Sequence, residues 1–321
     1  MIDVVALGEL LIDFTCVGAD ADGYPAMQAH PGGAPANFLA ALQKFGVSTA
    51  FLGKVGGDTF GDLLLDTLRK AEIETKGTVR DPDVFTTLAF VTLDEKGDRA
   101  FSFARKPGAD TCLRFEEVDL GLIDEAKVFH FGTLSLTDEP ARDATRRAVA
   151  YAREKGKLIT CDPNLREPLW RDLAEARVQM LWSLEQADVI KISEEEVQFL
   201  FSLDAEAGAA HILEEFGCQL VFVTCGEKGC YYLNEKSGGF VPALQGIEVQ
   251  DTTGAGDIFF GSALSQILRA DCAPKALADG QLREITRFAC TSAGLSTTLP
   301  GGISSVPELQ TVLQKMKSET N

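Results

Sequence analysis

The chain has 321 residues, 45% of them hydrophobic, and a formal net charge of −18. This length allows one large domain or two ordinary ones. Because no internal repeat, low-complexity tract or Pro/Gly-rich linker divides the sequence, we expect a single domain over residues 1–321. The acidic balance argues against nucleic acid as a partner, since bulk charge would repel the phosphate backbone.

The N-terminus and the cysteines bear on location. The first apolar run is interrupted by Gly8 and Glu9, and it lacks the basic start of a signal peptide. No apolar stretch is long enough to span a bilayer. The eight cysteines lie mostly inside apolar segments without a Cys-x-x-Cys pair, which favours buried free thiols over disulfides or a zinc site. We therefore expect a cytoplasmic protein with no membrane partner.

Short apolar runs alternate with helical patterns along the chain. The predicted strands are near-continuous apolar runs, as expected for strands buried on both faces of a parallel sheet. They cover Val4–Leu7, Ala50–Lys54, Val128–Phe131, Leu158–Cys161, Val189–Ile192 and Leu220–Thr224. The predicted helices cover Ala36–Phe45, Phe60–Lys70, Ala141–Lys155, Ala205–Glu215, Ile258–Leu268 and Leu282–Leu295. This alternation predicts an α/β fold with a doubly wound, mostly parallel sheet in three layers, α/β/α.

Two stretches interrupt the alternation. Residues 11–28 follow the first strand without a helical pattern, and residues 86–103 are typical of two strands around a turn at 94–97. Antiparallel pieces of this kind fit poorly inside a parallel sheet. We therefore expect residues 11–31 and 86–112 to form a small β-sheet lid over one edge, with a merely decorative hairpin as the alternative.

Residues 251–259, Asp-Thr-Thr-Gly-Ala-Gly-Asp-Ile-Phe, precede an apolar helix. Gly254, Ala255 and Gly256 are small enough to let a ligand approach the backbone, and a helix N-terminus presents N–H groups and partial positive charge. Such a pocket could hold phosphate charge during phosphoryl transfer, and Asp257 could accept a proton from an attacking hydroxyl. The simpler interpretation is an ordinary helix cap, but the full nine-residue string favours function. Neither a P-loop nor a dinucleotide fingerprint is found in the sequence.

Two further segments of the sequence, taken together with this motif, resemble the motifs of a known family. Together with Gly32-Gly33-Ala-Pro-Ala-Asn37 and Gly53-Lys-Val-Gly-Gly-Asp58, the motif makes the chain resemble the PfkB, or ribokinase-like, sugar kinases from about Val4 to Pro307. The resemblance implies a ribokinase-like fold and ATP as phosphate donor. It implies that Asp257 is the catalytic base and that Gly254, Ala255 and Gly256 form the anion hole.

The resemblance also assigns the ligand sites. Sugar binding is implied for Asp13, Gly32, Gly33 and Asn37, and nucleotide binding for Ser193, Thr224, Gly226, Gly229, Gly254 and Gly256. Glu196 is implied to organise Mg²⁺ through water, although the family usually has Asn where this chain has Ser193, and Ser193 with Glu196 also matches a capping box. A K⁺ site is implied at Asp251, Thr253, Ser296, Gly301 and Ser305, mainly through backbone carbonyls.

Segments 8–14, 103–110 and 162–166 resemble fructokinases within that family, which implies transfer to the primary hydroxyl of D-fructose to give fructose 6-phosphate. Arg105 and Arg166 could point at the sugar or the transferring phosphate, or form surface salt bridges instead. A 2-keto-3-deoxygluconate kinase, a ribokinase and, remotely, a non-catalytic sugar-responsive regulator are the alternatives. Exposed lid edges and the family resemblance predict a homodimer through the lid.

Overall fold

A large sheet runs through the centre of the molecule. The computed structural model describes residues 2–93 and 99–318, and in that part the sheet has the strand order β13-β12-β11-β10-β9-β8-β1-β4-β5. Neighbours from β11 to β5 pair in parallel, whereas β12 and β13 extend one edge by antiparallel pairing. The strands are β1 (Val4–Leu7), β4 (Thr49–Gly56), β5 (Thr78–Asp81), β8 (Val128–Gly132), β9 (Leu158–Asp162), β10 (Val189–Ser193), β11 (Leu220–Thr224), β12 (Gly229–Leu233) and β13 (Gly238–Pro242).

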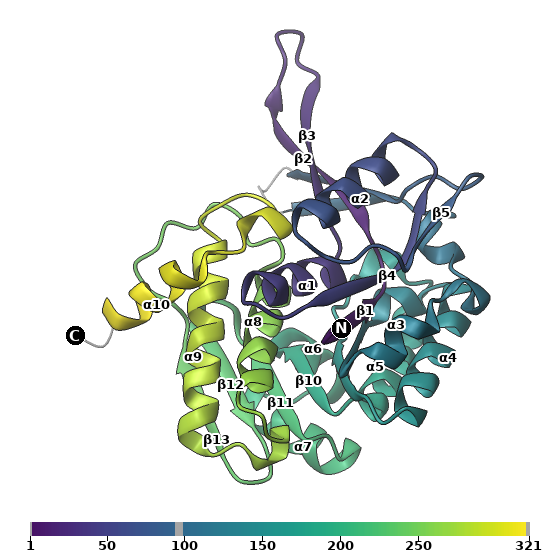
Figure 1. Cartoon of the computed structure of the whole chain (residues 1–321). Helices are drawn as coiled ribbons and strands as arrows, with labels where there is room; N and C mark the ends of the chain where they lie inside the picture. Colours follow the sequence, from purple (N-terminus) through teal and green to yellow (C-terminus); the bar gives the residue numbers. More distant parts are fainter. Residues whose placement is uncertain (1, 94–98, 319–321) are drawn as a thin grey trace.

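Helices cover both faces of this sheet (Figure 1). One face carries α1 (Ala34–Lys44), α2 (Thr59–Lys70), α8 (Ala255–Arg269) and α9 (Asp279–Ser296), and α10 (Leu309–Ser318) packs on the outside of this layer through Val312. The other face carries α3 (Leu120–Glu125), α4 (Ala141–Glu154), α5 (Leu173–Gln186), α6 (Glu194–Phe201) and α7 (Ala205–Phe216). The predicted three-layer, doubly wound α/β fold is confirmed.

The continuous apolar runs of the sequence follow from this layering. In β1, Val4 and Ala6 join the core under α1 and α8, while Val5 and Leu7 join the core under α3 and α4. Since neither face of the strand meets water, neither set of positions is polar.

The order of the strands indicates at which point along the sheet a ligand is expected to bind. From β1 the chain passes to β4 and β5 on one side, and it later returns to β8, β9, β10 and β11 on the other side. In open α/β sheets, ligands bind outside the carboxyl ends of the strands at the point where the strand order reverses. That point here is between β1 and β8.

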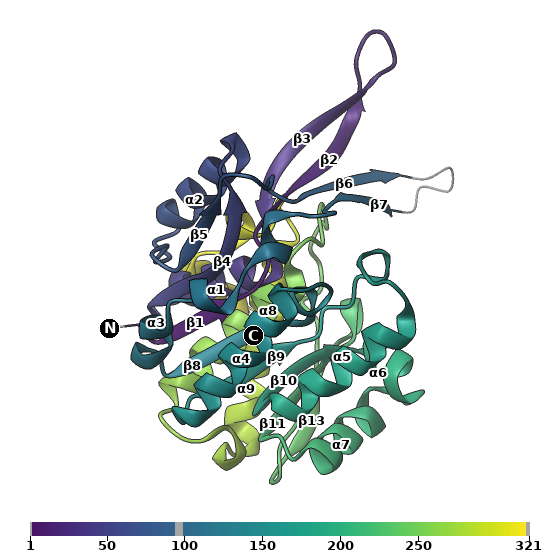
Figure 2. The same cartoon turned by 90° about the vertical axis from the view of Figure 1, so that its right-hand side faces the viewer.

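A second, four-stranded sheet has the order β3-β2-β6-β7, built from β2 (Leu11–Ala19), β3 (Pro25–Gly32), β6 (Leu88–Leu93) and β7 (Arg99–Ala104). The β2–β3 hairpin projects well beyond the body of the molecule (Figures 1 and 2). β2 pairs with β3 and β6 pairs with β7 in antiparallel fashion, whereas β2 pairs with β6 in parallel, a contact for which the sequence predicted no orientation. The reason is that these strands are not hairpin neighbours: α1, β4, α2 and β5 separate them in the chain.

The second sheet ends earlier in the chain than the expected lid, whose second part covers residues 86–112. Its last strand ends at Ala104, and the 3₁₀ helix Ala109–Cys112 packs against β4 of the main sheet. The turn expected at 94–97 lies outside the described residues. Within the described ranges, no helix combines the length and apolar character needed to cross a bilayer.

Candidate active site

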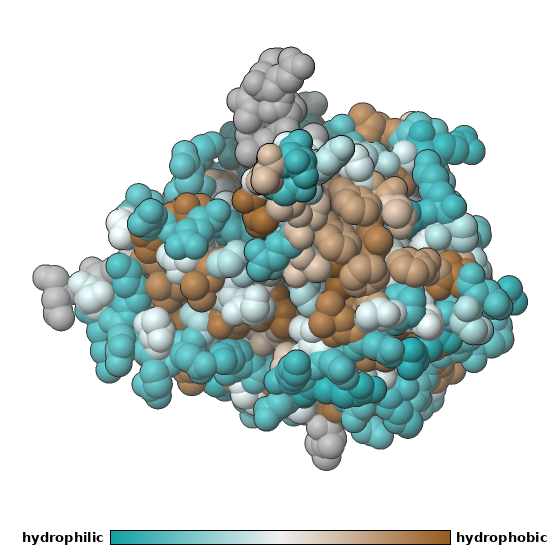
Figure 3. All heavy atoms as spheres, turned by 90° about the horizontal axis from the view of Figure 1, so that it is seen from above, coloured by the Kyte–Doolittle hydropathy of each residue, from teal (hydrophilic) through white to brown (hydrophobic). Residues whose placement is uncertain are grey.

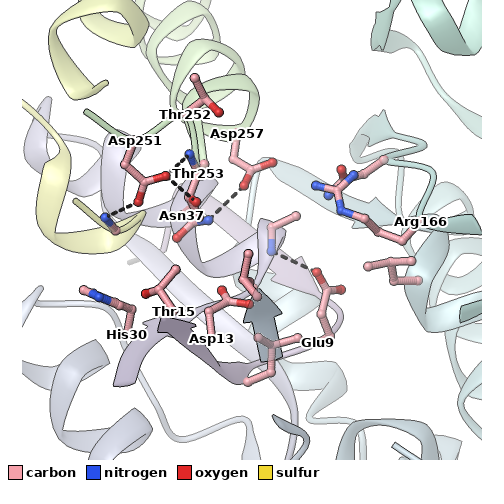
Figure 4. Close-up of a pocket in the computed structure, with 18 of the residues that line it drawn as sticks. Glu9, Asp13, Thr15, His30, Asn37, Arg166, Asp251, Thr252, Thr253 and Asp257 are labelled. Atoms are coloured by element: carbon pink, nitrogen blue, oxygen red, sulfur yellow. Dashed lines mark hydrogen bonds between the residues drawn. The ribbon is translucent and has the colours of Figure 1, made fainter. Parts of the chain in front are cut away.

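A pocket of about 350 Å³ opens between the carboxyl ends of the main-sheet strands and the second sheet. Asp13, Thr15 and Phe103 line it from the second sheet, and Asn37 and Asp257 line it from the helices of the main body (Figure 4). The pocket therefore lies at the edge that the strand order indicates.

The N-termini of α1 and α8 meet at this pocket. Asn37, in the first turn of α1, donates from Nδ2 to Oδ2 of Asp257, in the first turn of α8, at 2.9 Å. Burial raises the pKa of Asp257, and Glu196 raises it further, whereas the hydrogen bond from Asn37 and the charges of Lys191 and Arg166 lower it. An aspartate with a raised pKa in a pocket is suited to accept a proton.

Small residues and one lysine surround the start of α8. Gly254 adopts φ 75°, a left-handed conformation that favours glycine, and it precedes Ala255 and Gly256. A Cβ on Gly256 would lie 2.9 Å from Nζ of Lys191, so this ammonium lies directly beside the first turn of α8. Lys191 also forms a buried ion pair with Asp162 at 2.9 Å. The N–H of Ala255 is already bonded to the carbonyl of Thr252 at 3.3 Å.

Sequence reasoning assigned no role to Lys191, although a signal was present. Lys191 interrupts the apolar run of β10, and a charge buried in a central strand requires a partner. Burial alone lowers the pKa of Lys191, but Asp162, Glu196 and Asp257 around it raise the pKa overall. The lysine is therefore a permanent positive charge at the start of α8.

Asp13, one of the predicted sugar-binding residues, lines the pocket with Gly32 directly beside it. Burial raises the pKa of Asp13 to about 6, and Asp251 and Asp257 add to the shift, while Arg166 opposes it. A Cβ on Gly32 would lie 2.5 Å from Oδ2 of Asp13, and a Cβ on Gly33, whose φ is 124°, would lie 2.5 Å from the carbonyl oxygen of Glu9. The two glycines thus provide room for acidic residues on the pocket wall.

Glu9 is a pocket residue that sequence reasoning did not single out. It follows β1, is 3% exposed, and accepts at Oε1 from the N–H of Ala34 at 2.8 Å. Burial raises its pKa to about 7. An acidic residue directly after a buried strand was the available signal.

Comparison with known proteins identifies the family of this chain. Residues 1–309 match the pattern described as pfkB family carbohydrate kinase. The chain belongs to the pfkB family of carbohydrate kinases. It is 41% identical over 325 residues to the probable fructokinase-3 of Arabidopsis thaliana, covering 99% of this chain and 93% of that protein.

Solved structures show the same likeness. Fructokinase from Xylella fastidiosa with bound ATP has a TM-score of 0.91 and 31% identity, covering 99% of both chains. Fructokinase from Vibrio cholerae with fructose, ADP and calcium bound has a TM-score of 0.85 and 30% identity, covering 98% of both chains.

The two predicted arginines have different places in the kinase. Arg166 is exposed and lines the pocket (Figure 4). Arg105 is 5% exposed and is not among the described residues that line the pocket. Its guanidinium is held by Asp110 at 2.8 Å, by Oγ1 of Thr137 at 2.9 Å and by a backbone carbonyl at 2.8 Å. The structure therefore does not bring Arg105 to the pocket, because these acceptors hold its donors behind the pocket wall.

The predicted nucleotide residues gather at the carboxyl ends of β10 and β11, where Ser193 pairs with Thr224 in the strand register. Gly226 has φ 53°, and Gly229 has φ 133° with the backbone of β13 too close for any side chain. In the described part of the kinase, none of these four residues lines the pocket that holds Asp13 and Asp257. Gly229 thus has a structural reason to be glycine in addition to any contact with nucleotide.

Glu196 is buried, and the capping box expected from the sequence is present. Its Oε2 accepts from the N–H of Ser193 at 2.8 Å, and its Oε1 accepts from the N–H of Leu165 at 2.6 Å. Oδ1 of the nearby Asp162 has no hydrogen-bond partner among the described residues. A buried, unpartnered carboxylate oxygen beside a second carboxylate fits a hard cation such as Mg²⁺.

The residues of the predicted K⁺ site come from two loops that meet. Asp251 accepts at Oδ1 from both the N–H and the hydroxyl of Thr253, and at Oδ2 from the N–H of Gly301 at 2.9 Å. Ser296 and Ser305 are buried and donate to backbone carbonyls. Over residues 2–93 and 99–318, no group of three or more His, Cys, Asp or Glu side chains could hold a metal. A cation here would therefore rely on backbone and hydroxyl oxygens.

Proposed function

We propose that this kinase is a fructokinase, which transfers the γ-phosphate of ATP to the primary hydroxyl of D-fructose to give fructose 6-phosphate. The supporting observation is that Asp257 lines the pocket from the first turn of a helix whose N-terminus is formed by small residues. The similarity to fructokinases over nearly the whole chain supports the same sugar.

In the proposed reaction, Asp257 acts on the sugar hydroxyl, and the backbone at the start of α8 acts on the phosphoryl group. The sugar hydroxyl gives its proton to Asp257 as its oxygen attacks the γ-phosphorus, and the bond from phosphorus to ADP breaks. The N–H groups of Gly254 and Gly256 and the ammonium of Lys191 balance the negative charge that develops on the phosphoryl oxygens, and the N–H of Ala255 joins them when it leaves the carbonyl of Thr252. Positioning and charge stabilisation supply most of the catalysis, because the transition state is loose.

The charge of the pocket favours a neutral sugar over 2-keto-3-deoxygluconate. Four carboxylates line it, from Glu9, Asp13, Asp251 and Asp257, and Arg166 is the cationic side chain on the described wall. A substrate carboxylate would be repelled by this set, whereas sugar hydroxyls can donate to it. We assign sugar binding to Asp13, Gly32, Gly33, Asn37 and Arg166, with Arg105 supporting the wall from behind.

The nucleotide and ion assignments extend the proposal. ATP would lie along Ser193, Thr224, Gly226 and Gly229, next to the start of α8. Glu196 would hold Mg²⁺ through water, with Asp162 beside it, and the bound ion neutralises phosphate charge. K⁺ would bind at Asp251, Thr253, Ser296, Gly301 and Ser305.

The proposed cellular and oligomeric states also rest on particular observations. All eight cysteines carry free thiols, which suits a reducing cytoplasm. Four aromatic rings form a row that begins on the second sheet with Phe90 and Phe14 and continues to Phe60 of α2. The row ends at Phe85, in the segment before β6, whose side chain is 54% exposed. Apolar side chains gather beside the projecting hairpin (Figure 3). We propose that the lids of two copies pair here and cover this row.

A coupled ADP-release assay over fructose, 2-keto-3-deoxygluconate and ribose tests the function. We expect the highest kcat/KM on fructose, and we expect Asp257→Ala to lower kcat by roughly 10²-fold or more while ATP binding survives. Faster turnover on another sugar would reassign the substrate. Sugar binding without any turnover in the wild type would favour a regulator.

A further inference from the structure

Two helices bring one amide and one carboxylate together at the base of the pocket. Asn37 and Asp257 are 220 positions apart, yet Nδ2 of Asn37 lies 2.9 Å from Oδ2 of Asp257. Asn37 is 3% exposed and Asp257 is partly buried, so the hydrogen bond is shielded from water on the side of Asn37. Such a bond is stronger than the same bond at the surface, because the local dielectric constant is lower.

The packing of α1 on α8 sets this distance. Phe38, the neighbour of Asn37, has its ring 5.4 Å from that of Phe260 on α8 and stacks on His130 at 3.8 Å. Gly261 faces the carbonyl of Phe38 so closely that any side chain at Gly261 would collide with it. The two helix starts are therefore held in a close-packed contact that leaves the amide little freedom.

The orientation of the Asn37 amide follows from its surroundings. Only the NH₂ group can donate to a carboxylate, so turning the amide over would place oxygen against oxygen. The other end of the amide lies against Gly302, and its Oδ1 has no hydrogen-bond partner in the described part of the chain. A Cβ on Gly254 would lie 3.0 Å from Nδ2, so glycine is needed there to admit the amide.

From this arrangement we infer that Asn37 is a positioning residue for Asp257, in addition to any contact that it makes with the sugar. The hydrogen bond holds Oδ2 on the side of α1. Figure 4 shows the second oxygen of Asp257 turned away from Asn37, on the side of Arg166. One oxygen of the base is thus anchored and the other is presented to the reacting hydroxyl, which is the kind of preorganisation that proton transfer requires.

This inference rests on the proposed role of Asp257, and steady-state kinetics of Asn37→Ala separates it from a sugar-binding role alone. A positioning residue acts on the chemical step, so we expect kcat to fall roughly 10- to 100-fold, and any rise in KM from a lost sugar contact comes in addition to that fall. Asn37→Asp should be slower still, because a carboxylate beside Asp257 either repels it or shares its proton. Thr15→Ala, at a pocket residue on the second sheet, is the comparison that should change KM more than kcat.

A double-mutant cycle supplies the decisive control. If Asn37 acts through Asp257, then Asn37→Ala should change the residual rate of Asp257→Ala by less than about twofold. A large rise in KM with unchanged kcat, or additive losses in the cycle, would overturn the inference. Asn37→Ser replaces Asn37→Ala if thermal melting shows that the alanine variant does not fold. The cycle uses whichever sugar the wild type phosphorylates, so a wrong sugar assignment is seen separately.

Discussion

At the scale of single residues, burial brings the pKa of Asp13 close to neutral pH. Its pKa is raised to about 6, chiefly by burial, so in its proposed sugar-binding role the carboxylate would accept hydrogen bonds from sugar hydroxyls above that pH and lose an acceptor below it. Fructose affinity should therefore weaken as the pH falls, by about fourfold between roughly pH 7.5 and 5.5.

Isothermal titration calorimetry with fructose over this range measures that change without involving turnover. Asp13→Asn should lose the step near pH 6. A pH-independent affinity in the wild type would show that Asp13 does not accept from the sugar as a carboxylate.

At the scale of elements, Lys54 on β4 fastens the segment that holds Cys112 and Glu117 to the main sheet. Its ammonium, on a side chain only 4% exposed, pairs with Asp81 of β5 at 3.3 Å and with Glu117 at 2.7 Å, and it donates to the carbonyl of Cys112 at 3.0 Å. The segment around Lys54 that resembles the family thus has a structural function.

Lys54→Met should lower the free energy of unfolding by about 2 to 3 kcal/mol, because it leaves two partly buried carboxylates without their partner. Urea denaturation at neutral pH measures the loss. Lys76→Met is the matched control, since Lys76 pairs with Asp119 from a side chain that is 70% exposed, and its loss should be below about 0.5 kcal/mol. Equal effects of the two variants would contradict the role given to Lys54.

At the scale of the whole molecule, the second sheet projects from the body and exposes apolar side chains that the body does not cover. A hairpin with Val17 60% and Tyr24 69% exposed, together with the row that ends at Phe85, leaves apolar surface in water. Pairing two such sheets would cover the row and the free strand edges.

Multi-angle light scattering should therefore give twice the chain mass of 34.6 kDa at micromolar concentration. Phe85→Ser should shift the protein toward monomer with an unchanged circular dichroism spectrum, whereas Leu173→Ser, at an exposed apolar residue on α5, should leave the mass unchanged. A wild type that is monomeric at these concentrations would contradict the proposed dimer.

The amino-acid sequence by itself determined the layered fold and the position of the proposed chemistry. Strands buried on both faces must be apolar along their length, and helix starts carry local residue signatures, so β1, β10 and the start of α8 could be read without coordinates. Asp257 was recognisable because its neighbours in the chain are also its neighbours in space.

Only the tertiary structure decided which distant residues act together. It held Arg105 behind the pocket and left Arg166 on its wall, placed Lys191 beside Gly256, and brought Asn37 to Asp257. The parallel pairing of β2 with β6 was decided at the same level. The physical reason is that these contacts depend on how helices and sheets pack across long sequence separations, and local spacing carries no information about that packing.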